Sequence, residues 1–550
     1  MIADIHITEK SFGDKTLMKD VKFSVDDGEK VGVVGRNGVG KSTLFGILSG
    51  KDTDYTGEVI FRRGITIATT AQEHHGLGEQ TVMTYILGGL PEYPELKKII
   101  DEYPLTMGDN MRKIEEYTQA LERFDQKGFY QIEEKIEREL SNFQLDGYGN
   151  RRISSLSGGQ KRLVEIVKIM HSEAHLALID EPTNHMDYVA KQQFIDWMNS
   201  QPHQAMLIIT HDRDVLGQVD RIVEIKDGQA VSYRGNYDAY LKQNAQATTA
   251  GMNNFEQIEK RIVNLKQKVL DYQRLKEKSR NPGTIQKFKR LENEARSELA
   301  ELSEMEKPTF WIDKESVGQL DYKSAERYGK FKSRNIRLSM KDASSRSQHV
   351  LVRAENVAVG IGERILFEDV NIDLREGEAI EIRGRNGAGK TTLIRMILPS
   401  VKSFDGGPIL YSGDIFLDPQ VRIGVYEQEI DERYLSDPLE KAIEKLYMSR
   451  DLSISDTKIR QLLADYLFTD ADRMTPLARL SGGQKARFQI IAMLANDPQL
   501  LVLDEPTNHL DLPSIEELET ALAKYSGAIL YVSHDNYFRE KLGGKVVQIG

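Results

Sequence analysis

The feature that most constrains this chain is that its motifs are written twice. "GRNGVGKST" begins at Gly35 and returns as "GRNGAGKTT" at Gly384, while "LSGGQK" begins at Leu156 and returns at Leu480. Two further motifs recur in the same order, "DEPTNHMD" as "DEPTNHLD" and "ITHD" as "VSHD". An ordered repeat of this kind predicts two copies of one domain.

Two domains also suit the length, because 550 residues are too many for one hydrophobic core. Short apolar runs such as "KVGVVG", "LALID" and "AILYVS" predict buried parallel strands, and stretches such as "QKRLVEIVKIMHS" predict helices between them. We therefore expect an α/β fold with two P-loop nucleotide-binding domains at 1–242 and 349–550. The segment 243–348 should join them.

The two copies differ by a local insertion. From Gln72 to Ser157 the first copy spans 85 positions, whereas the second spans 53 from Gln428 to Ser481. We therefore expect a short extra element in the first copy at about 88–123.

The composition excludes several kinds of protein. The chain has no cysteine, which rules out disulfides, iron–sulfur clusters and cysteine nucleophiles. A reducing cytoplasm is the compartment that this composition suits. No stretch approaches the roughly 20 apolar residues that span a bilayer, and the N-terminus does not read as a secretory signal. We expect a cytoplasmic protein without a membrane partner.

Each glycine-rich motif predicts a phosphate-binding loop. Gly-x-x-x-x-Gly-Lys-[Ser/Thr] after an apolar strand lets backbone N–H groups surround phosphates, with the lysine at the β- and γ-phosphates and the hydroxyl on Mg²⁺. ATP and Mg²⁺ are the expected cofactors. The expected nucleotide-binding residues are Gly35, Asn37, Gly38, Gly40, Lys41, Ser42 and Thr43, and Gly384, Asn386, Gly387, Gly389, Lys390, Thr391 and Thr392.

A second group of residues is expected to carry the chemistry. Asp180 and Asp504 end apolar strands and should hold Mg²⁺ together with Ser42 and Thr391. The next residues, Glu181 and Glu505, should polarise the attacking water as general bases. His211 and His534 follow further buried strands and should sense the γ-phosphate. A single histidine in such a place is more often structural, but its duplication favours the catalytic interpretation.

The Leu-Ser-Gly-Gly-Gln motif predicts a second anion site at the start of a helix. Its expected ligand groups are the hydroxyl, backbone amides and side-chain amide of Ser157, Gly158, Gly159 and Gln160, and of Ser481, Gly482, Gly483 and Gln484. This pattern resembles the signature motif of the ATP-binding cassette (ABC) family, and the resemblance covers both halves of the chain.

The resemblance implies how the halves work together. In that family the signature of one cassette completes the ATP site of the other, so Ser157 would face the nucleotide held by Lys390, and Ser481 the one held by Lys41. The chain would then act as a monomer with paired cassettes. The resemblance further implies that Phe12 stacks on adenine, although Ile361 stands at the equivalent place in the second copy. Gln72 and Gln428 are also expected among the magnesium ligands.

The sequence "DEPTNH" resembles the ABC-F branch of the family, whose members act on ribosomes. That resemblance implies binding at the tRNA exit site in the ATP-closed state, with hydrolysis driving release. Cassettes of transporters usually have a small residue after "DEPT", so a transporter ATPase is the less favoured alternative. A DNA-repair cassette protein is disfavoured too, because those proteins need far longer coiled coils or zinc cysteines, and no DNA partner is expected.

The connector concentrates positive charge in a chain whose formal net charge is -11. From Lys260 to Arg290 there are eleven Lys or Arg and two acidic residues. Apolar residues recur at helical spacing on both sides of "NPG" at Asn281, which predicts an antiparallel helical hairpin with its first helix from about Asn253 to Arg280. Such a charge run is usually a solvated face. Its segregation toward the loop favours a polyanion ligand.

The resemblance implies what that ligand is. The hairpin would be the ABC-F linker, which approaches P-site tRNA, 23S-type rRNA and the peptidyl-transferase centre, and the insertion would be the branch's arm. The residues expected to contact RNA are Lys276, Lys278, Arg280, Lys287, Lys289 and Arg290. The segment 322–346, with aromatic Tyr322, Tyr328 and Phe331, is either a second RNA-facing strip or a tether. The long connector favours ribosomal protection against antibiotics, with housekeeping control of elongation as the alternative.

Overall fold

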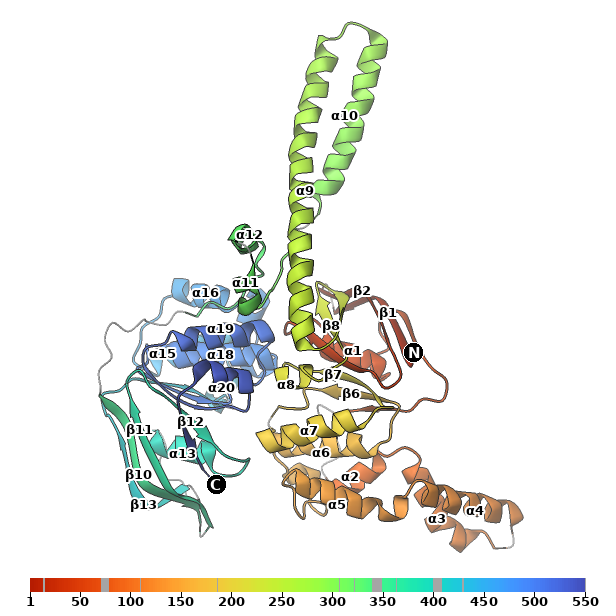
Figure 1. Ribbon diagram of the computed structural model, residues 1–550, viewed down its shortest axis with the longest axis vertical. Coiled ribbons are helices and arrows are strands. Elements are labelled where there is room, and N and C mark those ends of the chain that lie inside the picture. Colours follow the sequence, from red (N-terminus) through yellow and green to blue (C-terminus); the bar gives the residue numbers. More distant parts are fainter. Residues whose placement is uncertain are drawn as a thin grey trace. The chain divides into compact units, whose positions relative to one another are not determined.

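The computed structural model describes residues 1–12, 15–70, 79–108, 110–184, 186–305, 307–320, 322–338, 349–362, 364–398, 408–427 and 430–549. They form two compact units, one of Met1–Tyr237 with Ile336–Gly550 and one of Asp238–Asn335. The first unit holds both copies of the repeat and the second holds the connector (Figure 1). No helix in these described ranges is long and apolar enough to cross a membrane.

The first cassette is built around a six-stranded sheet in the order β5-β6-β7-β3-β8-β9, in which neighbours pair in parallel except β8 with β9. Strands β6 and β7 are buried along their whole length, as their unbroken apolar runs predict. The remaining strands of the first cassette form a three-stranded antiparallel sheet in the order β2-β1-β4. Their bounds are β1 (Ala3–Phe12), β2 (Lys15–Val25), β3 (Lys30–Gly35), β4 (Thr56–Phe61), β5 (Ile67–Thr69), β6 (Leu176–Asp180), β7 (Ala205–Ile209), β8 (Arg221–Lys226) and β9 (Gln229–Arg234).

The extra residues of the first cassette form two helices, α3 and α4, which lie side by side (Figure 1). The rings of Tyr93, Phe124 and Phe129 pack at centroid distances of 5.2–5.6 Å and fix the base of this pair. The helices are α1 (Lys41–Leu48), α2 (Val82–Gly88), α3 (Tyr93–Thr106), α4 (Met111–Gln126), α5 (Ile132–Asn142), α6 (Gly158–His171), α7 (Tyr188–Ser200) and α8 (Arg213–Leu216), with 3₁₀ turns at Phe129–Gln131 and Ile153–Ser155.

The second cassette repeats this plan with a five-stranded parallel sheet, β14-β15-β16-β12-β17, and an antiparallel sheet, β11-β10-β13. Its strands are β10 (Val350–Ile361), β11 (Arg364–Arg375), β12 (Ala379–Arg383), β13 (Pro408–Leu417), β14 (Ile423–Tyr426), β15 (Leu500–Asp504), β16 (Ala528–Val532) and β17 (Lys545–Gln548). Its helices are α13 (Lys390–Ile397), α14 (Glu432–Leu435), α15 (Leu439–Met448), α16 (Asp456–Asp465), α17 (Asp470–Arg473), α18 (Gly482–Leu494), α19 (Leu512–Ala523) and α20 (Asn536–Leu542), with a 3₁₀ turn at Leu477–Arg479.

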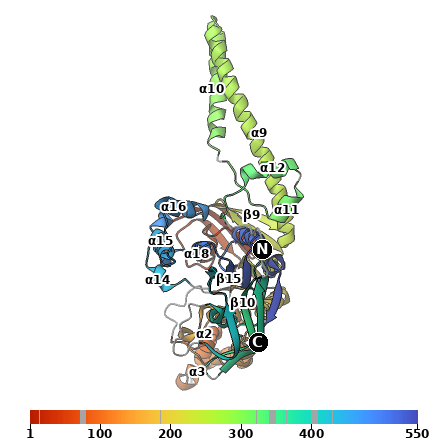
Figure 2. The same cartoon turned by 90° about the vertical axis from the view of Figure 1, so that its left-hand side faces the viewer.

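The connector forms the expected hairpin of α9 (Tyr237–Lys278) and α10 (Pro282–Ser303), seen from two sides in Figures 1 and 2. Helix α9 has 42 residues and begins well before Asn253, so the expected start of this helix was wrong. The side chain of Asn281 caps α10 by accepting from the backbone N–H of Gly283 at 2.9 Å. Stacked rings of Tyr272 and Phe288, 6.3 Å apart, hold the two helices together near the loop.

The connector ends in α11 (Lys314–Gln319) and α12 (Tyr322–Phe331). Tyr328 and Phe331 are buried here against Met252 and Ile312, so they do not form an exposed aromatic strip, and that expectation was wrong for both. Their burial follows from the amphipathic character of α12, whose apolar face packs on α9. The side chain of Tyr322 and residues 339–348 lie outside the described part of the chain.

The hairpin has a small core of its own, and one substitution tests it. Leu265 is 2% exposed and packs with Val269 and Ala295. We expect Leu265→Ala to destabilise the hairpin by about 2–5 kcal/mol, because it leaves a cavity. Amide hydrogen exchange of α9 and α10 should then quicken by at least about tenfold, with the cassettes unchanged. Val263→Ala is the matched control, since Val263 on the same helix is 65% exposed; equal exchange in both variants would contradict this account of the hairpin.

Candidate nucleotide sites

Each phosphate-binding loop joins a central strand to a helix, β3 to α1 and β12 to α13. Gly40 and Gly389 cap these helices with φ of 100° and 97°, a left-handed conformation that favours glycine. Lys41 Nζ donates to the carbonyls of Gly35 and Arg36 at 2.7 and 3.1 Å. Lys390 repeats this with the carbonyls of residues 384 and 385, both at 2.9 Å. The two ammonium groups therefore lie across their own loops.

The hydroxyl and carboxylate expected to hold Mg²⁺ meet in both cassettes. Ser42 Oγ donates to Asp180 Oδ2 at 3.0 Å, and Thr391 Oγ1 donates to Asp504 Oδ2 at 2.8 Å. Oxygen donors of this kind suit magnesium. The other expected ligands, Gln72 and Gln428, lie outside the described residues.

The glutamates that follow these aspartates have an unusual backbone. Glu181 and Glu505 have φ of 47° and 53°, in the left-handed region where a side chain is strained. His211 Nε2 lies 3.6 Å from Glu181 Oε1, and His534 Nε2 lies 3.3 Å from Glu505 Oε1. Both copies have the same strained backbone, so this conformation is a feature of the site and not of one cassette.

Burial sets the protonation of these pairs. It raises the pKa of Glu505 to about 7 and, together with the nearby Asp180 carboxylate, that of Glu181 to about 8. It also lowers the pKa of His211 and His534 to about 3. Near neutral pH both imidazoles are therefore uncharged, and both carboxyls titrate in the range where a general base is most useful.

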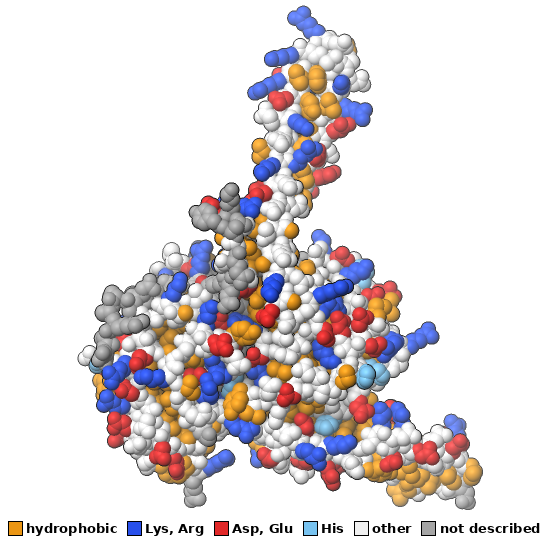
Figure 3. Space-filling model, viewed as in Figure 1, with side chains coloured by type: hydrophobic (Ala, Val, Ile, Leu, Met, Phe, Trp, Pro, Cys, Tyr) orange, Lys and Arg blue, Asp and Glu red, His pale blue; other side chains and the backbone are white. Residues whose placement is uncertain are grey.

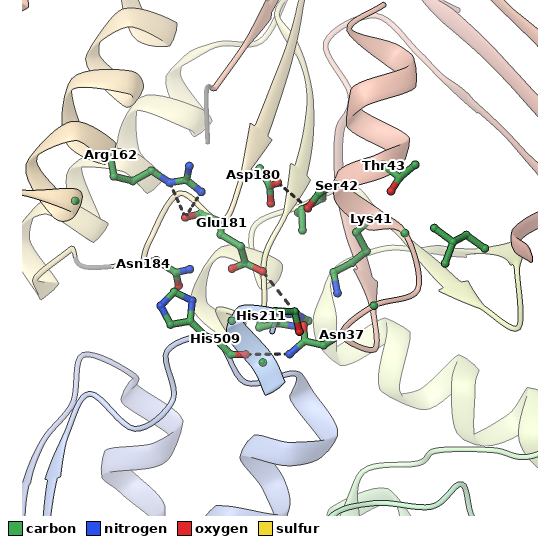
Figure 4. A pocket seen from close by; sticks show the side chains of 18 of the residues that line it. Asn37, Lys41, Ser42, Thr43, Arg162, Asp180, Glu181, Asn184, His211 and His509 are labelled. Atoms are coloured by element: carbon green, nitrogen blue, oxygen red, sulfur yellow. Dashed lines mark hydrogen bonds and ion pairs between the residues drawn. The ribbon is translucent and has the colours of Figure 1, made fainter. Parts of the chain in front are cut away.

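Two cavities each draw on both cassettes. The first, about 640 Å³, is shown in Figure 4. Of the expected residues it is lined by Asn37, Gly38, Gly40, Lys41, Ser42, Thr43, Gly158, Asp180, Glu181, His211, Ser481, Gly482 and Gly483. The second, about 800 Å³, is lined by Asn386, Gly387, Gly389, Lys390, Thr391, Thr392, Asp504, Glu505, His534, Ser157, Gly158, Gly159 and Gln160. The signature of each cassette thus shares a cavity with the phosphate loop of the other.

Several expected residues behave differently. Phe12 is 56% exposed at the end of β1 and is not among the residues lining the first cavity, which Leu17 lines instead. Ile361 does line the second cavity, beside Arg364. Gly35 and Gly384 do not line the cavities, and their carbonyls accept hydrogen bonds from Lys41 and Lys390.

The side-chain amides of the signature glutamines are already used within their own cassettes. Gln160 Oε1 accepts from the N–H of Ser157 at 3.0 Å, and its Nε2 donates to the Tyr148 hydroxyl at 3.1 Å. Gln484 caps Ser481 in the same way and donates to Asp472 at 2.7 Å. The capping box thus engages both amides within their own cassettes, and their contact with an anion stays a prediction. The serine hydroxyls and the N-terminal backbone N–H groups of the two helices remain as candidate donors to an anion.

Two aspartates that the sequence analysis left out join the cassettes. Asp187 Oδ2 accepts from the backbone N–H of Asn386 at 2.9 Å, and Asp511 Oδ2 accepts from that of Asn37 at 3.1 Å. Burial opposes ionisation of both carboxyls, but the backbone donors outweigh it and the pKa of each is lowered. Each is the last residue of the repeated "DEPTNH-x-D" motif, so the repetition itself was a signal for them.

Arg162 was also missed, and here the sequence held no signal. Its guanidinium donates from Nε and Nη2 to the carbonyl of Glu181 at 3.2 and 3.1 Å, which supports the strained turn (Figure 4). The corresponding residue of the second cassette is Ala486. An unrepeated arginine within a helix does not stand out from the sequence.

The raised pKa values of Glu181 and Glu505 predict how stability depends on pH. Their ordinary pKa is 4.5. Between that value and about 7 to 8 the native state binds more protons than the unfolded state, so stability falls as pH rises through this window. We expect the urea midpoint to decrease from pH 5 to 8, and to decrease less in Glu181→Gln/Glu505→Gln. Glu58→Gln/Glu102→Gln, at two exposed positions, should keep the wild-type dependence; equal slopes in all three proteins would refute the assignment.

Comparisons with known proteins place the chain in a family. The family model described as "ABC transporter" matches residues 18–184 and 367–508. ABC transporter F family member 2 of Arabidopsis thaliana is 29% identical, with 98% of this chain and 75% of that protein covered. Ribosome protection protein VmlR of Bacillus subtilis is 28% identical, with 96% and 83% covered. Energy-dependent translational throttle protein EttA of Mycobacterium tuberculosis is 27% identical, with 97% and 88% covered.

A solved structure supports the fold. The archaeal ribosome recycling factor aABCE1, in complex with the ribosomal stalk protein aP1, superposes with a TM-score of 0.56 at 17% identity, covering 99% of this chain and 89% of that one. At 17% identity this similarity supports the fold of the chain and nothing about its function. Since the family model covers more than half of the chain in two copies, and relatives of the F branch align over nearly all of it, this chain belongs to the ATP-binding cassette family and is a twin-cassette ATPase of its F branch.

Proposed function

We propose that this ATPase binds the ribosome at the tRNA exit site when both nucleotide sites are closed, with the hairpin reaching toward P-site tRNA and the peptidyl-transferase centre. ATP hydrolysis then opens the cassettes and releases the protein. The chain acts as a monomer, because each site already takes its two halves from one polypeptide. It works in the cytoplasm, where ribosomes are found. The observation that carries the proposal is the placement of exposed cations at the loop end of the hairpin.

At each ATP site the residues divide the work. Lys41 and Lys390 would bind the β- and γ-phosphates in place of their loop carbonyls. The hydroxyl–carboxylate pairs Ser42–Asp180 and Thr391–Asp504 would hold Mg²⁺, which would neutralise phosphate charge. The fit is supported by buried polar atoms: both ring nitrogens of His211 and Oε1 of Glu505 have no hydrogen-bond partner among the described residues. A phosphate oxygen and a water would satisfy them.

Glu181 and Glu505 then act as general bases. A water in each cavity gives its proton to the carboxylate as it attacks the terminal phosphate. His211 and His534, uncharged near neutral pH, donate a hydrogen bond to that phosphate and report its presence. Ser157 and Ser481 bring the opposing cassette onto the same phosphate through their hydroxyls and the N-termini of α6 and α18.

The charge on the hairpin supports an RNA partner. Lys and Arg side chains gather around its loop end (Figure 3). Lys278, Arg280, Lys287 and Lys289 are exposed there, and no ion pair is seen for them within the described ranges. Cations held apart from carboxylates are the ones that gain most from phosphate neutralisation and counterion release.

Two of the expected RNA contacts are partly engaged within the hairpin. Lys276 Nζ donates to Glu292 Oε2 at 2.6 Å, and Arg290 Nε donates to Glu294 Oε1 at 2.8 Å. The bond from Lys276 lowers the pKa of Glu292. Lys276 therefore mainly stabilises the hairpin. Arg290 is exposed, and it can exchange its surface ion pair for a phosphate at little cost in free energy.

Within this function we favour ribosomal protection that confers antibiotic resistance, as the name of the relative VmlR describes for that protein. The long hairpin, which can carry its loop about 60 Å along α9 at 1.5 Å per residue, supports this role. Control of elongation according to energy state is the alternative, matching the name of the relative EttA. A rise in the inhibitory concentration of a peptidyl-transferase antibiotic on expression, abolished by Glu505→Gln, would favour protection. Arrest set by the ATP-to-ADP ratio without resistance would favour control.

Co-sedimentation with ribosomes tests the proposal directly. Glu181→Gln/Glu505→Gln should close on ATP without hydrolysing it, so we expect retention in the ribosome pellet with ATP and none without nucleotide. Changing Lys278, Arg280, Lys287 and Lys289 to Gln in this background should reduce affinity at least about tenfold and flatten its salt dependence, by about one unit of slope for each lost phosphate contact.

The matched control removes the same charge elsewhere. Lys19, Lys22, Lys51 and Arg63 are exposed on the first cassette, and their change to Gln should leave retention within about twofold. Equal loss in both sets would show a bulk charge effect and refute the assignment to the hairpin. Sedimentation with membranes in place of ribosomes would support a transporter ATPase instead.

A further inference from the structure

A third, small cavity lies between the two nucleotide sites. It measures about 50 Å³, and its wall includes Glu181 and His211 of one site and Glu505 and His534 of the other. Such a volume admits water. The two catalytic pairs therefore line one common space, together with residues outside the repeated motifs.

Two residues at corresponding positions face this cavity and differ completely in chemistry. Lys191 follows Asp187 by four positions on α7, and Ile515 follows Asp511 by four positions on α19. Both are buried, with Lys191 only 4% exposed. One cassette therefore offers a cation here and the other an aliphatic side chain.

The ammonium group of Lys191 reaches across to the other cassette. Its Nζ donates to the backbone carbonyl of His534 at 2.7 Å and to Asp214 Oδ2 at 2.7 Å, and lies 3.1 Å from Asp212 Oδ2. Burial alone would lower its pKa, but these carboxylates raise it, so the group is charged. A buried lysine with this set of partners is held in one place.

The bond to His534 has a consequence for the catalytic pair. The N–H of His534 donates to Glu505 Oε2 at 3.2 Å, so the backbone of this residue is held on both sides, by Glu505 and by Lys191. At the first site the equivalent position is occupied by Ile515, which has no donor for the carbonyl of His211. The histidine loop of the first site is tied to the opposing cassette by a different contact, two residues after His211, where Arg213 Nη2 lies 3.0 Å from Glu519 Oε1 of α19. Only at the second site is the carbonyl of the histidine itself bound by a lysine of the other cassette.

We propose that Lys191 is a positioning residue for the second ATP site: by crossing the cassette interface it holds His534 against Glu505, so that hydrolysis at this site depends on cassette closure through a contact that the first site lacks. The proposal rests on the assignment of Glu505 as general base made above. It makes the two sites unequal through one residue outside the repeated motifs.

ATP hydrolysis by the full chain, with one site silenced at a time, tests this. In Glu181→Gln, where the second site works alone, we expect Lys191→Met to lower kcat about tenfold and to leave KM for ATP within about twofold. In Glu505→Gln, where the first site works alone, Lys191→Met should lower kcat by a clearly smaller factor, because there Lys191 pairs with Asp212, the neighbour of His211, and does not bind the histidine carbonyl. Lys191→Arg keeps a cationic donor and should restore most of the second-site rate.

Controls separate positioning from folding. Ile515→Met, at the corresponding buried position, should change neither site by more than about twofold. If Lys191→Met lowers the melting temperature, Lys191→Met/Asp214→Asn keeps the charges balanced and should again lose more activity at the second site than at the first. Equal loss at both sites, or none at the second, would overturn the proposal. Residual turnover in Glu181→Gln/Glu505→Gln would instead show that the assignment of the general bases is wrong.

Discussion

Both nucleotide sites depend on one interaction, made twice: a carboxylate of one cassette accepts the backbone N–H of the phosphate loop of the other. Asp187 does this for Asn386, and Asp511 does it for Asn37. The same carboxylates cap α7 and α19, so each fixes the start of its own helix while it holds the opposite loop. Neither cavity is complete without both cassettes.

The close approach around these bonds explains why small residues stand at the interface. A Cβ added to Gly483 would lie 2.1 Å from Asn37 Nδ2, which itself donates to the carbonyl of His509 at 2.9 Å. The signature glycine is thus needed for contact with the opposing loop as much as for its own helix start. A charged acceptor with backbone donors binds more strongly than a neutral pair, and its burial makes the loss of either partner costly.

Much of this could be predicted because the relevant residues are repeated. The phosphate loops, the Asp-Glu pairs and the histidines follow from motifs in fixed order, whereas the exchange of Ser157 and Ser481 between cassettes was implied by the resemblance to the ABC family. Other features depend on three-dimensional packing that spacing does not reveal. Burial of Tyr328 and Phe331 is an example, since an aromatic side chain in a basic segment reads equally as an RNA contact or as core.

The extent of α9 is a second case. The apolar spacing on which the prediction rested begins at Phe255. The start of α9 is also buried, but its buried positions include the polar Asn244 and Thr248, so no apolar pattern marks it. Interactions within the hairpin were also beyond sequence reasoning: Lys276 is one of a row of cations, and nothing in the row shows that Glu292 lies beside it.

The residues that distinguish the two sites are the unrepeated ones. Arg162 braces the strained turn at Glu181 and has Ala486 as its counterpart, while Lys191 reaches the second site and has Ile515 as its counterpart. The motifs give both sites the same chemistry, so any inequality must come from such neighbours. Under the proposal made above, a cation on one side of a nearly symmetric interface couples cassette closure to hydrolysis more strongly at the second site than at the first.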